Sequence, residues 1–316
     1  MVKKRLYYPL SEYLKQRFNT KVYKITIDAG FTCPTRDGTK GWGGCIYCDA
    51  YGSGNRLFKQ GKSIKEQIES AREILLRKYK TEKFFLYFQA FTNTYAPVNK
   101  LKEIYNTALK CNKGDIVGII IGTRPDCINR EKLELISSYT KKYEVWIEYG
   151  LQSIHQKSLN FIERGHSVDD YVNAIRLTRQ FPLKITTHII VGLPTETKAE
   201  MLQTARFVAS PGFSDAIKIH SLYIPKSSKL AQLYEKEKFS LLTLDEYVEI
   251  VADILEILPE NMIISRLTGE TDRENLVAPE WVLNKQLVIQ KILNTLKKRN
   301  SYQGKFYNQL DSPFRL

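Results

Sequence analysis

Long apolar runs and cysteine-rich patterns are absent from this 316-residue chain. No apolar stretch approaches the ~20 residues that a membrane-spanning helix requires. The basic N-terminus is not followed by the apolar core of a secretory signal. Five cysteines without an export signal do not make a disulfide framework. We therefore expect a cytoplasmic protein with no membrane partner, in which the cysteines have another role.

Acidic residues are scarce, and the shortage is confined to the two ends of the chain. The net charge is +14, and residues 1–24 and 283–316 each hold seven cations and one acid, so that residues 25–282 are nearly neutral. Two basic ends indicate a polyanionic partner such as nucleic acid. A solubilising surface is the alternative. An anionic membrane is disfavoured, since neither end has a strongly amphipathic helix with Trp or Phe on its apolar face.

The hydrophobic pattern alternates between short β-branched runs and helical periods. With 43% hydrophobic and 26% charged residues, the chain is typical of a globular protein. The runs carry no hairpin signal between them, which favours parallel strands covered on both faces. We predict an α/β fold, a partial (βα)6 TIM-type barrel, with strands at 22–29, 84–89, 115–122, 143–149, 184–192 and 216–223 and helices at 63–80, 97–110, 129–139, 167–180 and 197–209.

Beyond Pro225 the periodicity changes. A helix is expected over 243–258, a further strand is possible at 262–267, and a longer helix is expected over 279–299 with Pro279 near its start. The chain therefore divides into a basic N-terminal segment (1–20), the barrel (21–225) and a mostly helical C-terminal extension (226–316).

Three cysteines share one Gly-rich loop after the first strand. Cys45 and Cys48 form a CxxC pair, Tyr47 precedes the second of them, and eleven residues separate Cys33 from the pair. A structural zinc site needs four ligands, whereas three thiolates suit a 4Fe-4S cluster with one iron left open. The remaining Cys111 and Cys127 are interpreted as small core residues.

This loop resembles that of the radical S-adenosylmethionine (radical SAM) superfamily, although the usual spacing there is CxxxCxxC. The long spacing is similar to that of the YhcC/YtqA-like family, relatives of the elongator catalytic subunit. Further motifs agree in order: TRPD at 123–126, EYGLQS at 148–153, RGH at 164–166, VGLPTET at 191–197, KIHSLY at 218–223, SRLTGE at 265–270, APEW at 278–281 and YQG at 302–304.

The resemblance implies a set of site residues at the carboxyl ends of the strands, where such barrels gather their sites. The implied cluster ligands are Cys33, Cys45 and Cys48, and the open iron binds S-adenosylmethionine. The implied cofactor-binding residues are Tyr47, Gln89, Glu148, Gln152, Ser153, Arg164, Gly192 and Leu193. The candidate substrate shell is Arg124, Asp126, His166, Lys218, His220 and Arg266, each of which could instead be structural. His188, in mid-strand, is interpreted as a core histidine.

The resemblance also implies a chemistry and a substrate. One electron, delivered by a donor such as flavodoxin or ferredoxin, cleaves S-adenosylmethionine to a 5′-deoxyadenosyl radical, which abstracts hydrogen from carbon. Kinship with the elongator subunit implies tRNA and the C5 side chain of the wobble uridine. The chain length leaves no room for an added acetyltransferase domain, so processing of an existing aminomethyl-type side chain is favoured.

Aromatic residues near the C-terminus could stack on bases or pack back on the barrel; they are Tyr302, Phe306, Tyr307 and Phe314. Two rival functions stay open: a radical enzyme acting on a small metabolite, and a non-catalytic iron–sulfur redox or binding protein.

Overall fold

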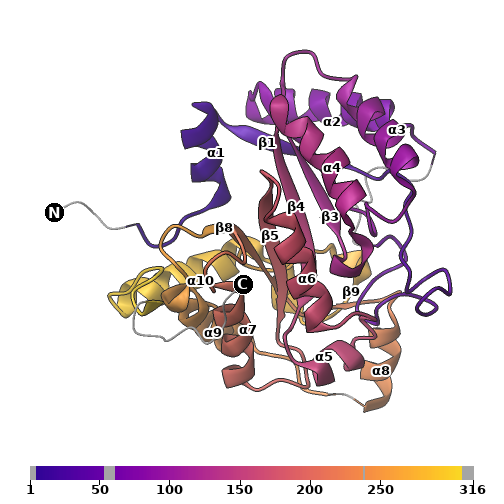
Figure 1. Ribbon diagram of the computed structural model, residues 1–316. Coiled ribbons are helices and arrows are strands. Elements are labelled where there is room, and N and C mark those ends of the chain that lie inside the picture. The colour runs from indigo at the N-terminus through magenta and orange to yellow at the C-terminus, as the bar shows by residue number, and fades with distance from the viewer. Residues whose placement is uncertain (1–4, 53–60, 238, 308–316) are drawn as a thin grey trace.

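Seven parallel strands form a curled sheet in the order β1-β2-β3-β4-β5-β6-β8. The computed structural model describes residues 5–52, 61–237 and 239–307 (Figure 1). The strands are β1 (Val22–Ile27), β2 (Lys83–Phe88), β3 (Ile116–Thr123), β4 (Glu144–Gln152), β5 (Lys184–Val191), β6 (Ala216–Ser221) and β8 (Ile263–Arg266). Because β1 and β8 end the sheet without pairing with each other, the barrel is open on one side. The predicted partial barrel is confirmed, and the segment around 262–267 adds a seventh strand.

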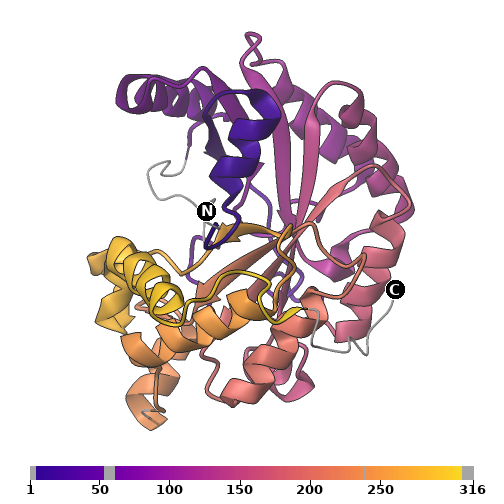
Figure 2. The same cartoon turned by 90° about the vertical axis from the view of Figure 1, so that its left-hand side faces the viewer.

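Helices cover the outer face of the sheet (Figure 2). They are α2 (Ile64–Tyr79), α3 (Val98–Leu109), α4 (Arg130–Ser138), α6 (Val168–Thr178) and α7 (Lys198–Val208). Helix α5 (Gln156–Phe161) packs instead against the cysteine loop, where Leu159 belongs to the apolar cluster that contains Ile46. Four helix starts carry a Ser or Thr cap with a carboxylate three residues later, at Ser63, Ser167, Thr197 and Thr243. This reciprocal capping satisfies the first backbone N–H groups, which explains why the sequence locates these helix starts closely.

The N-terminal end of the barrel is closed by apolar side chains and by helix α1 (Leu10–Phe18). Alternate residues of the strands point inward, among them Phe85, Trp146 and Ile263, and these pack with Leu14 of α1. The sequence predicts only a basic segment over residues 1–20, so helix α1 was not expected. Its single buried residue gives too weak an apolar face to be recognised without the barrel beneath it.

The C-terminal part contains α8 (Lys229–Glu237), α9 (Leu244–Ile257), α10 (Lys285–Lys298) and a small antiparallel pair, β7 (Ile224–Pro225) and β9 (Leu276–Ala278). The single helix expected over 279–299 is wrong in its first part. A 3-10 turn, Glu280–Leu283, comes first. Asn284 then leaves the helical conformation and its side chain accepts a hydrogen bond from the N–H of Leu287, so that α10 begins after it.

Two sets of terminal residues have partners within the protein. Phe306 and Tyr307 are partly buried and pack against the main core, which is one of the two alternatives that the sequence left open. Arg299 pairs with Asp253 and Glu256 of α9 at 2.7 and 3.2 Å, and also with Glu249. Tyr302 is partly exposed, and Phe314 lies outside the described residues. Within the ranges that the structure describes, no helix has the length and apolar character needed to cross a membrane.

Candidate active site

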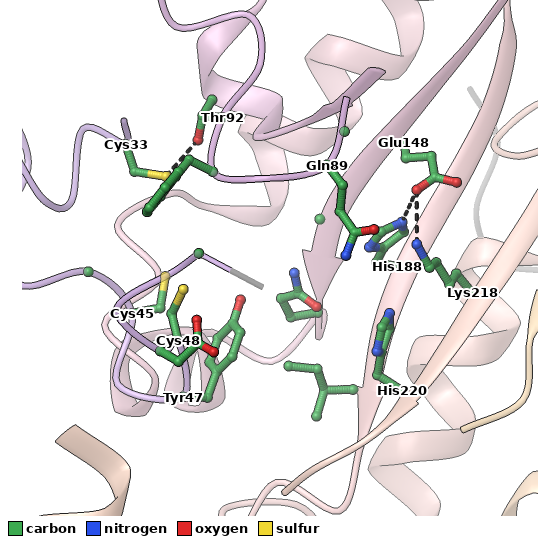
Figure 3. A pocket seen from close by; sticks show the side chains of 18 of the residues that line it. Cys33, Cys45, Tyr47, Cys48, Gln89, Thr92, Glu148, His188, Lys218 and His220 are labelled. Atoms are coloured by element: carbon green, nitrogen blue, oxygen red, sulfur yellow. Dashed lines mark hydrogen bonds and ion pairs between the residues drawn. The ribbon is translucent and has the colours of Figure 1, made fainter. Parts of the chain in front are cut away.

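A cavity of about 740 Å³ lies at the carboxyl ends of the strands. Twelve of the residues singled out in the sequence line it: Cys33, Cys45, Tyr47, Cys48, Gln89, Arg124, Glu148, Gln152, Arg164, Lys218, His220 and Arg266. Five others lie outside the lining: Asp126, Ser153, His166, Gly192 and Leu193. Figure 3 shows the cysteines with Tyr47 on one side of the cavity, and Glu148, Lys218 and His220 on the other.

The cysteine loop presents three sulfur atoms to the cavity. Cys45 and Cys48 lie side by side, and Cys33 lies apart from them, with its Sγ 2.9 Å from Oγ1 of Thr92 (Figure 3). The turn between Cys45 and Cys48 is closed by a 2.9 Å backbone hydrogen bond. Burial and the neighbouring Cys45 raise the pKa of the Cys48 thiol to about 12. Thiolates in such a buried site need a cationic centre to hold them.

The three thiols do not form a site for one metal ion. Among the described residues, no three His, Cys, Asp or Glu side chains are close enough to share a single metal ion. In a 4Fe-4S cube each thiolate binds a different iron, so its ligands stand apart by about the width of the cube. The three thiols and their cationic surroundings therefore fit such a cluster.

Arg164 places a cation beside the cysteine loop. Its Nη1 donates to Sγ of Cys45 at 3.5 Å, its Nη2 donates to the carbonyl of Gly150 at 2.8 Å, and its Nε donates to Nε2 of His166 at 2.9 Å. Burial, together with the charges of Arg164 and Arg124, lowers the pKa of His166 to about 3. His166 is thus a neutral acceptor that positions the guanidinium from behind the cavity wall.

Arg124 stands next to Arg164 and is tied to the same wall. Its Nη1 donates to the backbone carbonyl of Arg164 at 2.7 Å, while its other nitrogens pair with Asp126 at 2.9 Å. Burial acts to raise the pKa of Asp126, but hydrogen bonding to Arg124 outweighs it and lowers that pKa to about 2. Asp126 therefore fixes Arg124 as a permanent ion pair and does not itself reach the cavity.

The end of β4 departs from regular strand geometry. Gln152 has a left-handed φ of 75°, and the register with β5 shifts between Gly150 and Gln152. A Cβ at Gly150 would lie 2.5 Å from Nη2 of Arg164. Strain of this kind is retained where it aims a side chain. It turns Gln152 into the cavity, while Ser153 faces away and donates to Glu196.

A buried ion network forms the opposite wall (Figure 3). Oε2 of Glu148 accepts from the Tyr87 hydroxyl at 2.6 Å and from Nζ of Lys218 at 3.1 Å, and it lies 2.9 Å from Nε2 of His188. Nζ of Lys218 also donates to the Tyr87 hydroxyl at 2.6 Å. Lys24 of β1 lies 3.6 Å from the other carboxylate oxygen. Four strands thus hold one carboxylate.

The charges in this network are unevenly balanced. Burial acts to raise the pKa of Glu148, but Lys218, Lys24 and His188 outweigh it and hold that pKa well below its usual range. Burial lowers the pKa of Lys218 to about 7, with Glu148 opposing the shift and Arg266 and Lys24 adding to it. Lysine of this kind can exchange a proton near neutral pH.

Two residues of this wall were missed or misread in the sequence. His188 is not a core histidine, because it lines the cavity and contacts Glu148. Tyr87 was hidden in an apolar strand. The sequence did hold a signal, because every second residue of a strand points to the same face. Tyr87 lies two residues before Gln89, which the sequence had singled out, so the two share a face. His188 lies opposite Lys218 in the register of β5 and β6.

The turn at 192–193, which was expected to face adenine, is not part of the cavity lining. Leu193 packs in a satellite cluster with Ile46 and Leu222. The neighbouring Ile190 and Leu222 line the cavity. Gly192 has a φ of 98°, so the turn itself requires glycine.

Comparison with known proteins agrees with this architecture. A family profile described as the Radical SAM superfamily matches residues 38–208, and one described as the Radical_SAM C-terminal domain matches residues 214–298. The uncharacterized protein YtqA of Bacillus subtilis is 38% identical over 305 residues, which are 96% of this chain and 94% of YtqA.

More distant similarity leads to two further proteins. A tRNA uridine(34) acetyltransferase of Methanocaldococcus infernus is 27% identical over 154 residues, which are 48% of this chain and 28% of that protein. The solved structure of the archaeal Methanocaldococcus infernus Elp3 superimposes with a TM-score of 0.67 at 19% identity, over 91% of this chain and 67% of that one.

The curled parallel sheet with three cysteines beside its cavity is the fold of a radical SAM protein, and the chain belongs to that superfamily. Within it, the full-length similarity to YtqA assigns the chain to the YhcC/YtqA-like family, which is related to Elp3. Members of the superfamily use a 4Fe-4S cluster and S-adenosylmethionine.

Proposed function

We propose that this radical SAM enzyme modifies the C5 side chain of the wobble uridine of tRNA. Cys33, Cys45 and Cys48 hold the cluster in this proposal. The bound cluster and S-adenosylmethionine supply the 5′-deoxyadenosyl radical. In this proposal Tyr47 and Arg164, which line the cavity beside the cysteines, contact the cofactor.

The chain's own residues orient the reactants and exclude water. Arg164 donates to Sγ of Cys45 and so places positive charge beside this ligand. Gln89 and Gln152 offer amide groups at the ends of β2 and β4. Lys218, held by Glu148 and Tyr87, can hold or release a proton within the cavity. These groups can bind a polar substituent of a base while the radical reacts at carbon.

One observation carries the choice of RNA: the basic ends of the chain are joined beside the site. The backbone N–H of Gln303 donates to the carbonyl of Leu6 at 2.9 Å, and the N–H of Ile264 in β8 donates to the carbonyl of Tyr8 at 2.7 Å. The N-terminal and C-terminal segments therefore form one region along β8, although Arg299 is neutralised. Clustered Lys and Arg bind phosphates, and a distant relative bears the name of a tRNA uridine(34) enzyme.

The test compares modified nucleosides in tRNA from cells with and without this protein, followed by reconstitution in vitro. Loss of one wobble-uridine derivative, accumulation of its precursor, and conversion of that precursor by purified protein together with 5′-deoxyadenosine release are expected. Identical nucleoside profiles would contradict the RNA substrate and favour a small metabolite. Absence of 5′-deoxyadenosine under reducing conditions would favour a non-catalytic iron–sulfur protein.

A further inference from the structure

A second cavity, of about 500 Å³, lies beside the first at the open side of the barrel. Five residues line both cavities, so the two are adjacent and share a wall; they are Thr26, Tyr87, Gln89, Lys218 and Arg266. The walls of this side cavity come from the two unpaired ends of the sheet, β1 and β8, from α1 and from the start of α10. Figure 2 shows the N-terminal and C-terminal helices on this side. The basic ends thus flank a cavity that adjoins the active site.

The side cavity is cationic. Among the described residues that line it, four are Lys or Arg (Lys24, Lys218, Arg266 and Lys285) and none is Asp or Glu. Two carboxylates contact these cations from the main cavity. Glu148 pairs with Lys24 and Lys218, and Glu270 lies 2.9 Å from Lys285 and 3.6 Å from Arg266. Lys24, Arg266 and Lys285, together with the partly protonated Lys218, outnumber the two carboxylates, and this excess of positive charge in a concave site attracts an anionic group.

Aromatic and hydroxyl groups accompany the charges. The ring of Tyr23 stacks on Tyr79 with centroids 4.4 Å apart, and Tyr7 forms another part of the wall. Oγ of Ser265 is buried, and within the described part of the chain it has no hydrogen-bond partner. Tyrosine faces suit planar bases, and a buried hydroxyl without a partner is a vacant donor and acceptor. A planar group with an attached anion matches this lining.

We propose that the side cavity binds the nucleotide next to the one that is modified, so that the RNA strand enters between β1 and β8. The proposal rests on the proposed RNA substrate. The main cavity has to contain the cluster, S-adenosylmethionine and the reacting base, so the rest of a polymeric substrate has to leave through an opening. Among the described residues, the side cavity adjoins the main cavity at the open side of the barrel and combines excess cations and tyrosine rings with no lining carboxylate, so we assign that opening to it. A single-stranded loop can supply a base that is free to stack there.

The experiment pairs a change in the protein with a change in the RNA. The probe is a short hairpin carrying the anticodon loop, with abasic sites placed singly on either side of the wobble uridine. Its binding to reconstituted protein is measured by fluorescence anisotropy. One abasic site should weaken binding to the unsubstituted protein about ten-fold, the usual order for a stacked base. Ser11→Trp fills the cavity from an exposed position of α1. In this variant the intact hairpin should bind about ten-fold more weakly, and the abasic site should cause no additional loss of affinity.

Matched controls separate this site from general charge. Lys285→Gln and Lys291→Gln each remove an ion-paired lysine of α10, but only Lys285 lines the cavity. The abasic penalty, which is the fold loss of affinity caused by the abasic site, should be smaller in Lys285→Gln and unchanged in Lys291→Gln. Ser138→Trp, at an exposed position outside the cavity, should behave like the unsubstituted protein. Thermal unfolding of each variant verifies that it is folded.

The outcomes distinguish the two proposals. If the intact loop binds no better than a scrambled one, the RNA substrate itself is wrong. If the loop binds specifically but the abasic penalty is equal in Ser11→Trp and the unsubstituted protein, the side-cavity assignment is overturned while the RNA substrate stands. Uridine monophosphate could compete with the hairpin in the unsubstituted protein but not in Ser11→Trp. That result would assign the cavity to a free nucleotide and overturn its assignment to the RNA strand.

Discussion

The backbone N–H of Tyr8 donates to Oε1 of Gln303 at 2.8 Å, across 295 positions of sequence. The amide nitrogen of Gln303 also donates to the carbonyls of Pro259 and Met262 at 2.6 and 2.8 Å. One buried side chain therefore fastens the N-terminal segment to the turn before β8. The YQG motif has this structural task, and Gly304 supports it, because a Cβ there would lie 2.5 Å from the side chain of Glu260.

Gln303→Ala should lower the free energy of unfolding by about 2–4 kcal/mol, because it leaves up to two backbone groups, the N–H of Tyr8 and the carbonyl of Met262, without partners. It should also make the N-terminal segment more susceptible to limited proteolysis. Urea denaturation and a protease time course measure the two effects. Gln290→Ala, at an exposed position on α10, is the control and should change stability by no more than about 0.5 kcal/mol. Equal stability of both variants would mean that the Gln303 contacts contribute little.

The cluster assignment predicts which cysteines matter. Cys33→Ala, Cys45→Ala and Cys48→Ala should each lose most of the iron and sulfide that anaerobic reconstitution introduces, because three thiolates are the minimum for this site. Cys111→Ala, at a partly buried position packed on the main core, should retain the full content. Full cluster content in a Cys45→Ala, Cys48→Ala double variant, or cluster loss in Cys111→Ala, would refute the assignment.

Replacing basic residues at the end of α10 should separate binding from stability. Lys297 and Lys298 are exposed. In a Lys297→Ala, Lys298→Ala variant, tRNA binding should depend less steeply on salt. The slope of log affinity against log salt concentration should fall by about one unit for each phosphate that the protein no longer neutralises. Its unfolding free energy should hardly change. Arg299→Ala should instead cost about 1–2 kcal/mol of stability, because it removes the partner of three carboxylates of α9. Unchanged slopes in the double variant would make these lysines a solvated helix face.

Lys218 should give stability a specific pH dependence. Its pKa is about 7 in the folded protein because of burial, and about 10.4 in the unfolded chain. Between these values the unfolded state binds the additional proton, so this residue makes the free energy of unfolding rise with pH, by up to about 1.4 kcal/mol per unit. The groups around it are Glu148, Tyr87, Lys24, His188 and Arg266.

Lys218→Met should remove this contribution. Anaerobic denaturation of both proteins from pH 7 to 10 measures the difference in slope, in which all other titrating groups cancel to first order. Parallel curves would show that Lys218 keeps its charge in the folded state. The same variant should keep its cluster, because Lys218 lies across the cavity from the cysteines (Figure 3), but should process substrate poorly.

Local patterns explain what could be predicted. Strand–helix alternation and the capping boxes at Ser63 and Thr197 act within a few residues, so the sequence defines them directly. The CxxC pair and the eleven-residue spacing before it likewise lie in one loop. Helix α10 shows the limit of such patterns, since the conformation of Asn284 decides where the helix begins.

The sequence by itself therefore determined the fold class, the cysteine loop and the family, because each depends on neighbours in the chain. Tertiary structure alone decided that Glu148 meets Lys218 and His188 in a buried network, that α1 closes the barrel, and that Gln303 joins the two basic ends. These contacts unite residues far apart in sequence. The distances between these residues depend on the curvature of the sheet, which brings β1 and β8 to the two sides of one opening.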